Sequence, residues 1–320
     1  MDFLSLLKFL VMLVIGFVFL VKGADWFVEG AAGIAVKLGI PEIIVGLTIV
    51  AMGTSAPEAA VSITSAFKGS ADITIGNVVG SNILNVAVIL GLTAVITTIA
   101  VLKSTVFIDI PFTLVVTILL LLLGLDGTVG RLDGIILWVF FIGYLAYLFV
   151  RTKKNKNSDS EEESDEIEAG KKLPIWKLLI LIVIGVVLIV LGSNVAVDGA
   201  KGIAKIMGMS DRLIGLTIVA LGTSLPELVT SVTAAKRGSA DLAVGNIVGS
   251  NIFNILFVVG TSALIIPVAF QSAFIIDAII AAVIMVILFL CVVRKKELRR
   301  VGGIVLLLSY VAYFIYLLMK

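Results

Sequence analysis

Apolar residues fill most of this chain in runs of about 20 residues, and short polar or glycine-rich segments separate the runs. A helix of about 20 apolar residues crosses the roughly 30 Å hydrocarbon core of a bilayer. The pattern therefore predicts an all-α membrane protein with ten transmembrane helices. The expected spans lie near residues 3–24, 40–66, 72–98, 105–124, 131–151, 174–197, 210–235, 241–267, 271–293 and 301–319.

Composition excludes several classes of protein. Hydrophobic residues make up 60% of the chain and charged residues 14%, which is too little charge for an ordinary soluble surface. There is no histidine and Cys291 is the one cysteine, so an intrachain disulfide and a zinc site of histidine and thiolate ligands are excluded. We expect no cofactor, no nucleic-acid partner and no obligate protein partner. The N-terminal run lacks a clear small-x-small cleavage signal, so we expect a retained span.

A polar segment, 152–173, separates a first half, 1–151, from a second half, 174–320. The segment is rich in Ser and Glu and nearly free of apolar residues, so we expect a solvated, disordered hinge, with a calcium-sensing role as the alternative. Lys and Arg gather beside this hinge and in the 294–300 connection. The positive-inside rule puts both connections in the cytoplasm, and both termini then face outward.

The two halves are related by an internal repeat. Gly23–Asn85 matches Gly192–Asn254 without a gap at an offset of 169 residues, and a little over half of the paired residues are identical. Five spans per half is an odd number, so the second half must enter the membrane inverted. Inverted repeats are typical of secondary transporters, whose binding sites lie at the repeat interface near the bilayer midplane.

A hexapeptide that is unfavourable in a membrane span occurs once in each half: GTSAPE at 53–58 and GTSLPE at 222–227. A carboxylate in a span costs roughly 2.5–3.5 kcal/mol on insertion scales, so a duplicated one indicates function. Pro57 and Pro226 lack an amide proton and clash with the carbonyl four residues earlier. We expect this to free backbone carbonyls in 51–54 and 220–223 as oxygen ligands.

A second motif follows in each half: GNVVGSNILN at 76–85 and GNIVGSNIFN at 245–254. Its glycines are spaced four apart, which permits close helix packing. Its polar residues at the same spacing share one helical face. We expect Asn77 and Asn246 to form interhelical hydrogen bonds. The expected ligands or cavity-lining residues of this motif are Ser81, Asn85, Ser250 and Asn254.

Together the motifs offer oxygen ligands and no nitrogen or sulfur ligand. Such a set suits Ca²⁺, which takes about 6–8 oxygens, and also Na⁺, whereas Mg²⁺ demands a more rigid geometry. Competition of the two cations for shared oxygens is a direct route to exchange. Three alternatives stay open: a proton-coupled calcium exchanger, an intramembrane hydrolase with paired carboxylates, and a passive channel. Asp109 and Asp277 lie near the starts of their spans, and we expect them to be either interfacial carboxylates or helix N-terminal carboxylates that the macrodipole stabilises.

The motif pair GTS-x-PE and GN-x-x-GSN-x-x-N, in two inverted copies, resembles the sodium/calcium exchangers of the calcium:cation antiporter superfamily, in particular its prokaryotic members. The resemblance implies an antiporter of the cell membrane, not an enzyme, in which entry of more than two Na⁺ drives extrusion of each Ca²⁺. Some prokaryotic members have an acid at one of the two final Asn positions, where this chain has Asn at both. We therefore expect the middle position to hold an extra cation or proton less readily.

The resemblance also implies the metal ligands. The central site would use Glu58, Glu227 and the carbonyls of Thr54 and Thr223. The flanking and middle ligands would be Ala51, Ser55 and Ser81 on one side, Ala220, Ser224 and Ser250 on the other, and Asn85 and Asn254 in the middle. From the inverted repeat we expect alternating access, with the first and sixth spans moving against the helices that carry the site.

Overall fold

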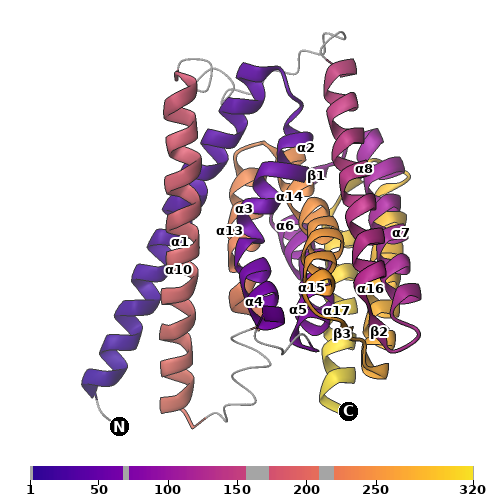
Figure 1. Ribbon diagram of the computed structural model, residues 1–320. Helices are drawn as coiled ribbons and strands as arrows, with labels where there is room; N and C mark the ends of the chain where they lie inside the picture. The colour runs from indigo at the N-terminus through magenta and orange to yellow at the C-terminus, as the bar shows by residue number, and fades with distance from the viewer. Residues whose placement is uncertain (1–2, 68–71, 156–172, 209–219, 320) are drawn as a thin grey trace.

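The computed structural model describes residues 3–67, 72–155, 173–208 and 220–319, and helices account for nearly all of them (Figure 1). The first half contains α1 (Phe3–Leu38), α2 (Glu42–Val45), α3 (Ala51–Thr54), α4 (Ala56–Phe67), α5 (Asp72–Leu84), α6 (Gly91–Ile96), α7 (Ile110–Leu123) and α8 (Arg131–Asn155). The second half contains α10 (Ile175–Ile206), α12 (Ala220–Thr223), α13 (Leu225–Lys236), α14 (Ala240–Phe253), α15 (Gly260–Ile265), α16 (Ser272–Val292) and α17 (Arg300–Met319). Wider π-helical segments precede or join some of these: η1 (Gly46–Val50), η2 (Asn85–Leu90), η3 (Thr105–Asp109) and η5 (Asn254–Val259).

The prediction of a helical membrane protein is confirmed. Within the described ranges, eight helical runs are long and apolar enough to cross a membrane. A bent run, Glu42–Thr54 with Ala56–Phe67, makes a ninth if its two arms count as one span. The expected span 210–235 lies partly outside the described residues, so the count of ten stays a prediction.

The first and sixth spans are longer than predicted. α1 continues to Leu38 and α10 to Ile206, whereas the expected spans ended near 24 and 197. The extra turns carry charged residues, which suggested loops. In the added part of α1, Phe27 is nevertheless completely buried. Asp25 in the same part forms an ion pair with Arg237, with an N···O distance of 3.2 Å. Tertiary packing therefore extends these helices beyond their most hydrophobic part.

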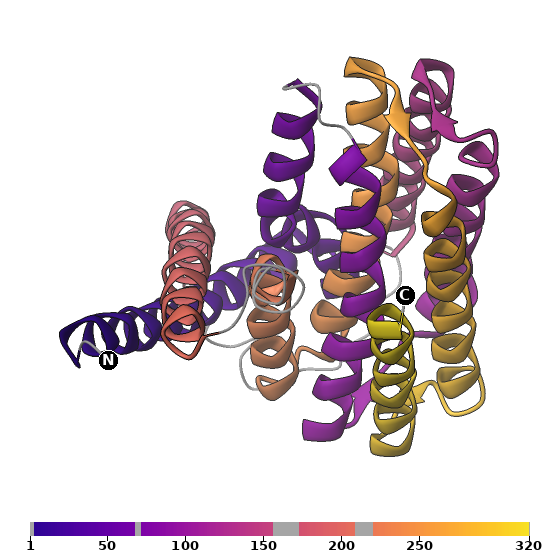
Figure 2. The same ribbon diagram turned by 90° about the horizontal axis from the view of Figure 1, so that it is seen from below.

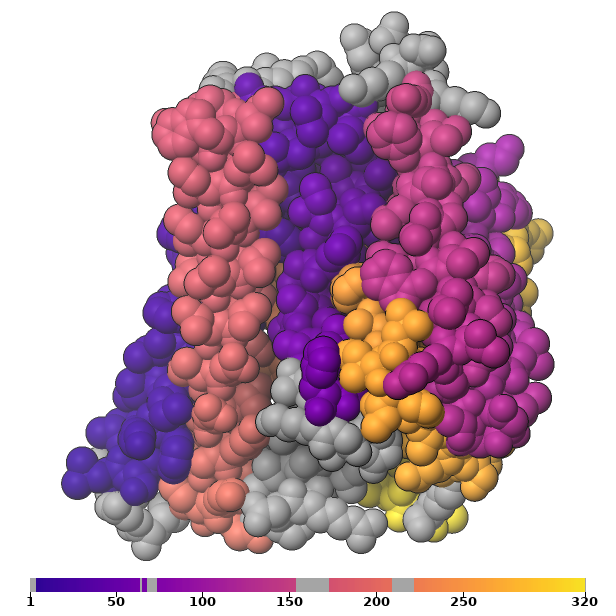
Figure 3. Space-filling model, viewed as in Figure 1, coloured from indigo at the N-terminus to yellow at the C-terminus, as the bar shows by residue number. Residues whose placement is uncertain are grey.

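α1 and α10 pack against each other as a pair along one side of the molecule (Figures 1 and 2). The pair is antiparallel, since Gly16 faces Ala196 whereas Gly23 faces Gly185. A Cβ on Gly23 would lie 2.8 Å from the Gly185 carbonyl oxygen, so the helices are too close for any side chain there. Figure 3 shows α10 as a continuous column beside the segment that contains α2–α4.

Two helical runs form the core: α5–η2–α6, and α14–η5–α15. Every residue from Leu242 to Phe253 in α14 is buried. Gly245 of this helix lies against Gly46, and a Cβ on Gly245 would be 2.8 Å from the Ile43 carbonyl oxygen. The close approach expected for the glycine pair of the second half is thus confirmed. It places the second motif of that half directly against the run that carries the first hexapeptide.

Two short antiparallel strand pairs join the halves. β1 (Ile99–Ala100) pairs with β4 (Glu297–Leu298), and β2 (Thr128–Val129) pairs with β3 (Val268–Ala269). The hydropathy pattern predicts neither pair. The start of α1 and the end of α17 lie at the lower end of the molecule in Figure 1, whereas α8 ends and α10 begins at the upper end.

Candidate ion-binding site

The helix break in each hexapeptide falls at its serine. α3 ends at Thr54, α4 begins at Ala56, and the two arms differ in direction by 49°. Ser55 and Ser224 have nearly the same backbone conformation, with φ −83° and ψ 7° against φ −93° and ψ 6°. The proline that follows lies in the first turn of a new helix, where its missing amide proton costs nothing.

The break frees fewer carbonyls than expected. The Ala51 carbonyl accepts the Ser55 amide at 3.0 Å, so the prediction that it leaves the helix ladder is wrong. The Gly222 carbonyl is freed from the helix ladder as expected, because Pro226 four residues later has no amide proton, and it accepts the Ser193 hydroxyl at 2.7 Å instead. Ser193 is a residue that sequence reasoning missed, because it lies on the sixth span, far from either motif.

Glu58 and Glu227 are both buried inside the helical core, at 0% and 1% exposure. Neither carboxylate oxygen of Glu58 has a hydrogen-bond partner among the described residues, and Oε2 of Glu227 also has none. Oε1 of Glu227 accepts the Ser55 hydroxyl at 2.8 Å, which joins the first hexapeptide to the second.

Among the described residues, no Lys or Arg forms an ion pair with these two acids. The ion pairs within the described ranges involve other residues: Arg151–Asp109, Lys201–Asp198, Arg237–Asp25 and Arg299–Glu297. A buried carboxylate without a counter-charge is strongly unfavourable, and a bound cation supplies that charge. Bound cations that carry up to two positive charges would balance this pair of carboxylates.

The predicted hydroxyl and amide ligands are mostly buried in the same region. Ser81 is 6% exposed, and the other fully placed ones are at most 1% exposed: Thr54, Ser55, Ser224, Ser250, Asn85 and Asn254. Ala51 is fully buried, and its carbonyl also accepts the Ser250 hydroxyl at 3.5 Å. Thr223 is half-buried and ends α12, whose first residue is Ala220. Ser224 Oγ, Asn85 Oδ1 and Asn254 Oδ1 have no partner among the described residues.

Asn77 and Asn246 form the expected interhelical hydrogen bonds. Asn246 donates to Ser231 at 2.9 Å and to the Glu227 carbonyl at 3.4 Å, and Asn77 makes the equivalent bonds to Ser62 and the Glu58 carbonyl. These contacts hold the turn after each proline against the neighbouring helix. Sequence reasoning missed both serines, although they also repeat at 169 residues.

Thr54 adds a bond between the halves. Its hydroxyl lies 2.9 Å from Oδ1 of Asn246 and 3.1 Å from the Val50 carbonyl oxygen, so it joins the end of α3 to α14.

A third pair of polar residues, Asn82 and Asn251, also escaped prediction. Each donates its side-chain amide to the backbone carbonyl of the other, at 3.1 and 3.2 Å. Their oxygens accept the side-chain amides of Asn254 and Asn85, at 3.2 and 3.0 Å. Both motifs of sequence GSN contain this residue, so the repeat was the signal that could have identified it.

Asp109 ends η3 and lies directly before α7. It is fully buried, and Arg151 donates to its two oxygens at 3.2 and 3.0 Å, while Arg151 also donates to Ser104. Burial of the carboxylate is therefore compensated by a guanidinium from the end of α8. This acid has its own counter-ion, unlike Glu58 and Glu227.

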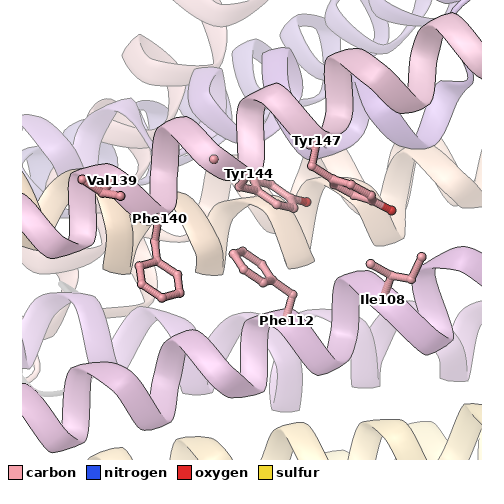
Figure 4. A pocket seen from close by; sticks show the side chains of 7 residues that line it. Ile108, Phe112, Val139, Phe140, Tyr144 and Tyr147 are labelled. Atoms are coloured by element: carbon pink, nitrogen blue, oxygen red, sulfur yellow. The ribbon is translucent and has the colours of Figure 1, made fainter.

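An open pocket of about 430 Å³ lies elsewhere, between η3–α7 and α8 (Figure 4). Phe112 and Tyr144 stack across it with ring centroids 4.9 Å apart. The lining contains no carboxylate and consists of Ile108, Phe112, Val139, Phe140, Gly143, Tyr144 and Tyr147. The pocket is therefore apolar and separate from the cation site.

Comparison with known proteins identifies a family, two relatives and a solved structure. A family described as "Sodium/calcium exchanger protein" matches residues 8–150 and 177–319. The chain is 35% identical to the sodium/calcium exchanger MaX1 of Methanosarcina acetivorans, over 97% of this chain and 98% of that protein. It is 34% identical to the uncharacterized membrane protein MJ0091 of Methanocaldococcus jannaschii, over 93% and 94% of the two chains. A solved structure of the sodium-calcium exchanger NCX_Mj superposes with a TM-score of 0.82 at 31% identity, covering 98% of this chain and 99% of that one.

Proposed function

This chain belongs to the sodium/calcium exchanger family and is a Na⁺/Ca²⁺ antiporter, and we propose that it expels Ca²⁺ electrogenically from a site built by both halves. The observation that carries the proposal is the pair Glu58 and Glu227. Both are buried. Among the described residues, three of their four oxygens have no hydrogen-bond partner, and no Lys or Arg forms an ion pair with them. A hard divalent cation balances both charges, and several Na⁺ can replace it on the same oxygens.

The proposed ligands surround this pair. The Thr54 and Thr223 carbonyls complete the central site, and Asn85 and Asn254 contribute oxygens in the middle. The flanking Na⁺ sites use Ala51, Ser55 and Ser81 in one half and Ala220, Ser224 and Ser250 in the other. The burial of Ser55, Ser224 and Ser250 supports this assignment, as do the unpartnered oxygens of Ser224, Asn85 and Asn254.

We assign the chain a ten-helix architecture of two inverted halves, 1–151 and 174–320, joined by the polar segment 152–173. The strand pairs support this symmetry, since residues 99 and 128 become 268 and 297 at the 169-residue offset and so exchange one pair for the other. The antiparallel packing of α1 and α10 supports it too. The Lys and Arg distribution supports a cytoplasmic segment 152–173 with both termini outside.

Transport then proceeds by alternating access. The site opens to one side at a time, because α1 and α10 move as a pair against the helices that carry the ligands. Two unpaired carboxylates disfavour the empty site, so the movement occurs when either Ca²⁺ or Na⁺ neutralises them. Exchange of more than two Na⁺ per Ca²⁺ moves net charge across the membrane.

The first prediction tests the carboxylate pair. In proteoliposomes loaded with Na⁺, the wild-type protein should take up radioactive Ca²⁺, and vesicles loaded with K⁺ or choline should not. Glu58→Gln and Glu227→Gln should each lower this uptake by at least about 100-fold, because each removes one of two charges that balance Ca²⁺ in a dry site. A membrane-potential dye reports the charge movement in the same vesicles.

The outcomes separate the candidates. Uptake that follows an imposed pH gradient and ignores Na⁺ would assign the protein to proton-coupled exchange instead. Full uptake in either Gln variant would remove the two glutamates from the site. Uptake without any change in membrane potential would contradict electrogenic exchange while leaving the antiport itself intact.

A further inference from the structure

Four asparagines at the contact between the halves form one chain of hydrogen bonds, with Asn82 and Asn251 at its centre and Asn85 and Asn254 at its ends. Asn82 and Asn251 exchange side-chain to backbone hydrogen bonds, with N···O distances of 3.1 and 3.2 Å. A backbone carbonyl can only accept, so the Nδ2 end of each side chain must face the partner's backbone. The opposite end, Oδ1, then faces the other way. The two ends of these amides are thereby fixed by groups that cannot reverse.

The fixed oxygens decide the orientation of the next two amides. Oδ1 of Asn251 can only accept, and Asn85 donates its Nδ2 to it at 3.0 Å. Oδ1 of Asn82 receives Nδ2 of Asn254 in the same way, at 3.2 Å. A reversed amide at Asn85 or Asn254 would bring two oxygens together. Each therefore turns its own Oδ1 away from the network.

Those outer oxygens are buried and have no partner within the described ranges. Asn85 begins η2, which contacts the helix of Glu227, and Asn254 begins η5, which contacts the helix of Glu58. π-helical segments inside helices occur frequently at functional sites. The network thus delivers two neutral, unpaired acceptors to the region of the carboxylate pair.

We infer that Asn82 and Asn251 are positioning residues: they make Asn254 and Asn85 present oxygens, and not N–H groups, to the transported cation. This inference rests on the proposed function, because it needs a cation to occupy the site. An amide that reversed would point a positive N–H dipole at the cation and weaken binding. The assignment is also specific to each pair, since Asn251 orients the amide of Asn85 and Asn82 orients the amide of Asn254.

Double-mutant cycles test which asparagine orients which. Asn251→Leu alone should raise the Ca²⁺ KM of Na⁺-driven uptake by about 10- to 100-fold, the size expected for a lost contact to a charged group. Added to Asn85→Leu, it should change the KM by less than about threefold, because the amide that it orients is already gone. Added to Asn254→Leu, the two fold-changes should multiply. Asn82→Leu should change the KM little when added to Asn254→Leu, and its fold-change should multiply with that of Asn85→Leu.

A second readout keeps the test independent of transport. The Ca²⁺-induced rise in melting temperature needs only binding, and it should follow the same pattern of coupled and independent pairs. A purely structural role predicts a lower melting temperature without Ca²⁺ and equal effects in both backgrounds, and that result would overturn the inference. If the wild type stabilises with Ca²⁺ but shows no Na⁺-driven uptake, the proposed exchange fails while the cycle still decides the role of Asn82 and Asn251. No stabilisation by Ca²⁺ would overturn both.

Discussion

Glu58 and Glu227 occupy equivalent positions in the repeat but differ in their hydrogen bonds. Ser55 donates to Glu227, whereas Ser224, its counterpart, has no hydrogen-bond partner among the described residues. The two halves therefore have the same residues in slightly different arrangements.

The second prediction concerns these two hydroxyls. Ser55→Ala and Ser224→Ala should each raise the Na⁺ concentration for half-maximal exchange by about tenfold, because each removes one neutral oxygen from a proposed Na⁺ site. The measurement is Ca²⁺ uptake against internal Na⁺ at fixed Ca²⁺. Ser262→Ala is the control. This hydroxyl is also buried and has no hydrogen-bond partner in the described part of the chain, but it lies in α15, beyond η5. An equal effect of all three substitutions would contradict the assignment.

At the scale of elements, a buried ion pair holds the start of α7 to the end of α8. Asp109 and Arg151 are 0% and 9% exposed in their side chains, with N···O at 3.0 Å. Breaking such a pair from one side is costly because it leaves an uncompensated charge. Arg151 therefore stabilises the packing of α8 against η3 and α7.

The third prediction follows from this pair. Asp109→Leu should destabilise the protein by about 3–5 kcal/mol, while Asp109→Leu combined with Arg151→Met should regain most of the loss. Thermal unfolding in detergent measures both. Glu297→Gln provides a control at the more exposed Arg299 pair, where a change of about 0–1 kcal/mol is expected. Equal melting temperatures for the single and double variants would refute the compensation argument.

The contact between α1 and α10 depends on glycine. A Cβ on Gly192 would lie 2.7 Å from the Gly16 carbonyl oxygen and from the Leu20 amide nitrogen, and backbone atoms cannot move aside. A Cβ on Gly143 in α8 would meet no atom within 4 Å.

The fourth prediction compares these two positions. Gly192→Ala should destabilise the protein by about 1–3 kcal/mol through overpacking. Gly143→Ala should instead stabilise it by about 0.5–1 kcal/mol, because alanine is the better helix former. Melting curves of the two variants should therefore move in opposite directions, and a shared direction would rule out the packing explanation.

These elements differ in how far they could be predicted. Runs of apolar residues identify the long helices, and Pro57 and Pro226 locate the two breaks, because these signals are local. The strand pairs, the Asp109–Arg151 pair and the last turns of α1 depend on residues that meet only in the folded chain. In the site, the repeat identifies both glutamates, but it does not reveal that Asn82 and Asn251 orient their neighbours.

At the scale of the whole molecule, the α1·α10 pair stands beside the helices that carry the site (Figure 2). It contacts α13 and the short helices α3 and α12, which begin the two hexapeptide regions. Movement of the pair would therefore reach the ligands directly. No long-range relay is needed to couple ion binding to opening.

The fifth prediction tests that movement. In a Cys291→Ala background, cysteines at Gly53 and Val186 should form a disulfide between α3 and α10, since a Cβ on Gly53 lies 3.3 Å from Val186 Cγ2. The cross-link should stop exchange, and reduction should restore it to the level of the uncross-linked double variant. Normal exchange with the bond intact would mean that α10 does not move against α3.

The paired strands also set the timing of assembly. β1 is synthesised at residues 99–100, but its partner β4 follows at 297–298, about 200 residues later. At about 5–20 residues per second, the first half waits roughly 10–40 s in the bilayer with unpaired backbone groups and unpartnered asparagines. During that interval the nascent chain is exposed to wrong partners and to quality control. The β1–β4 pair can therefore form only after most of the second half has been synthesised.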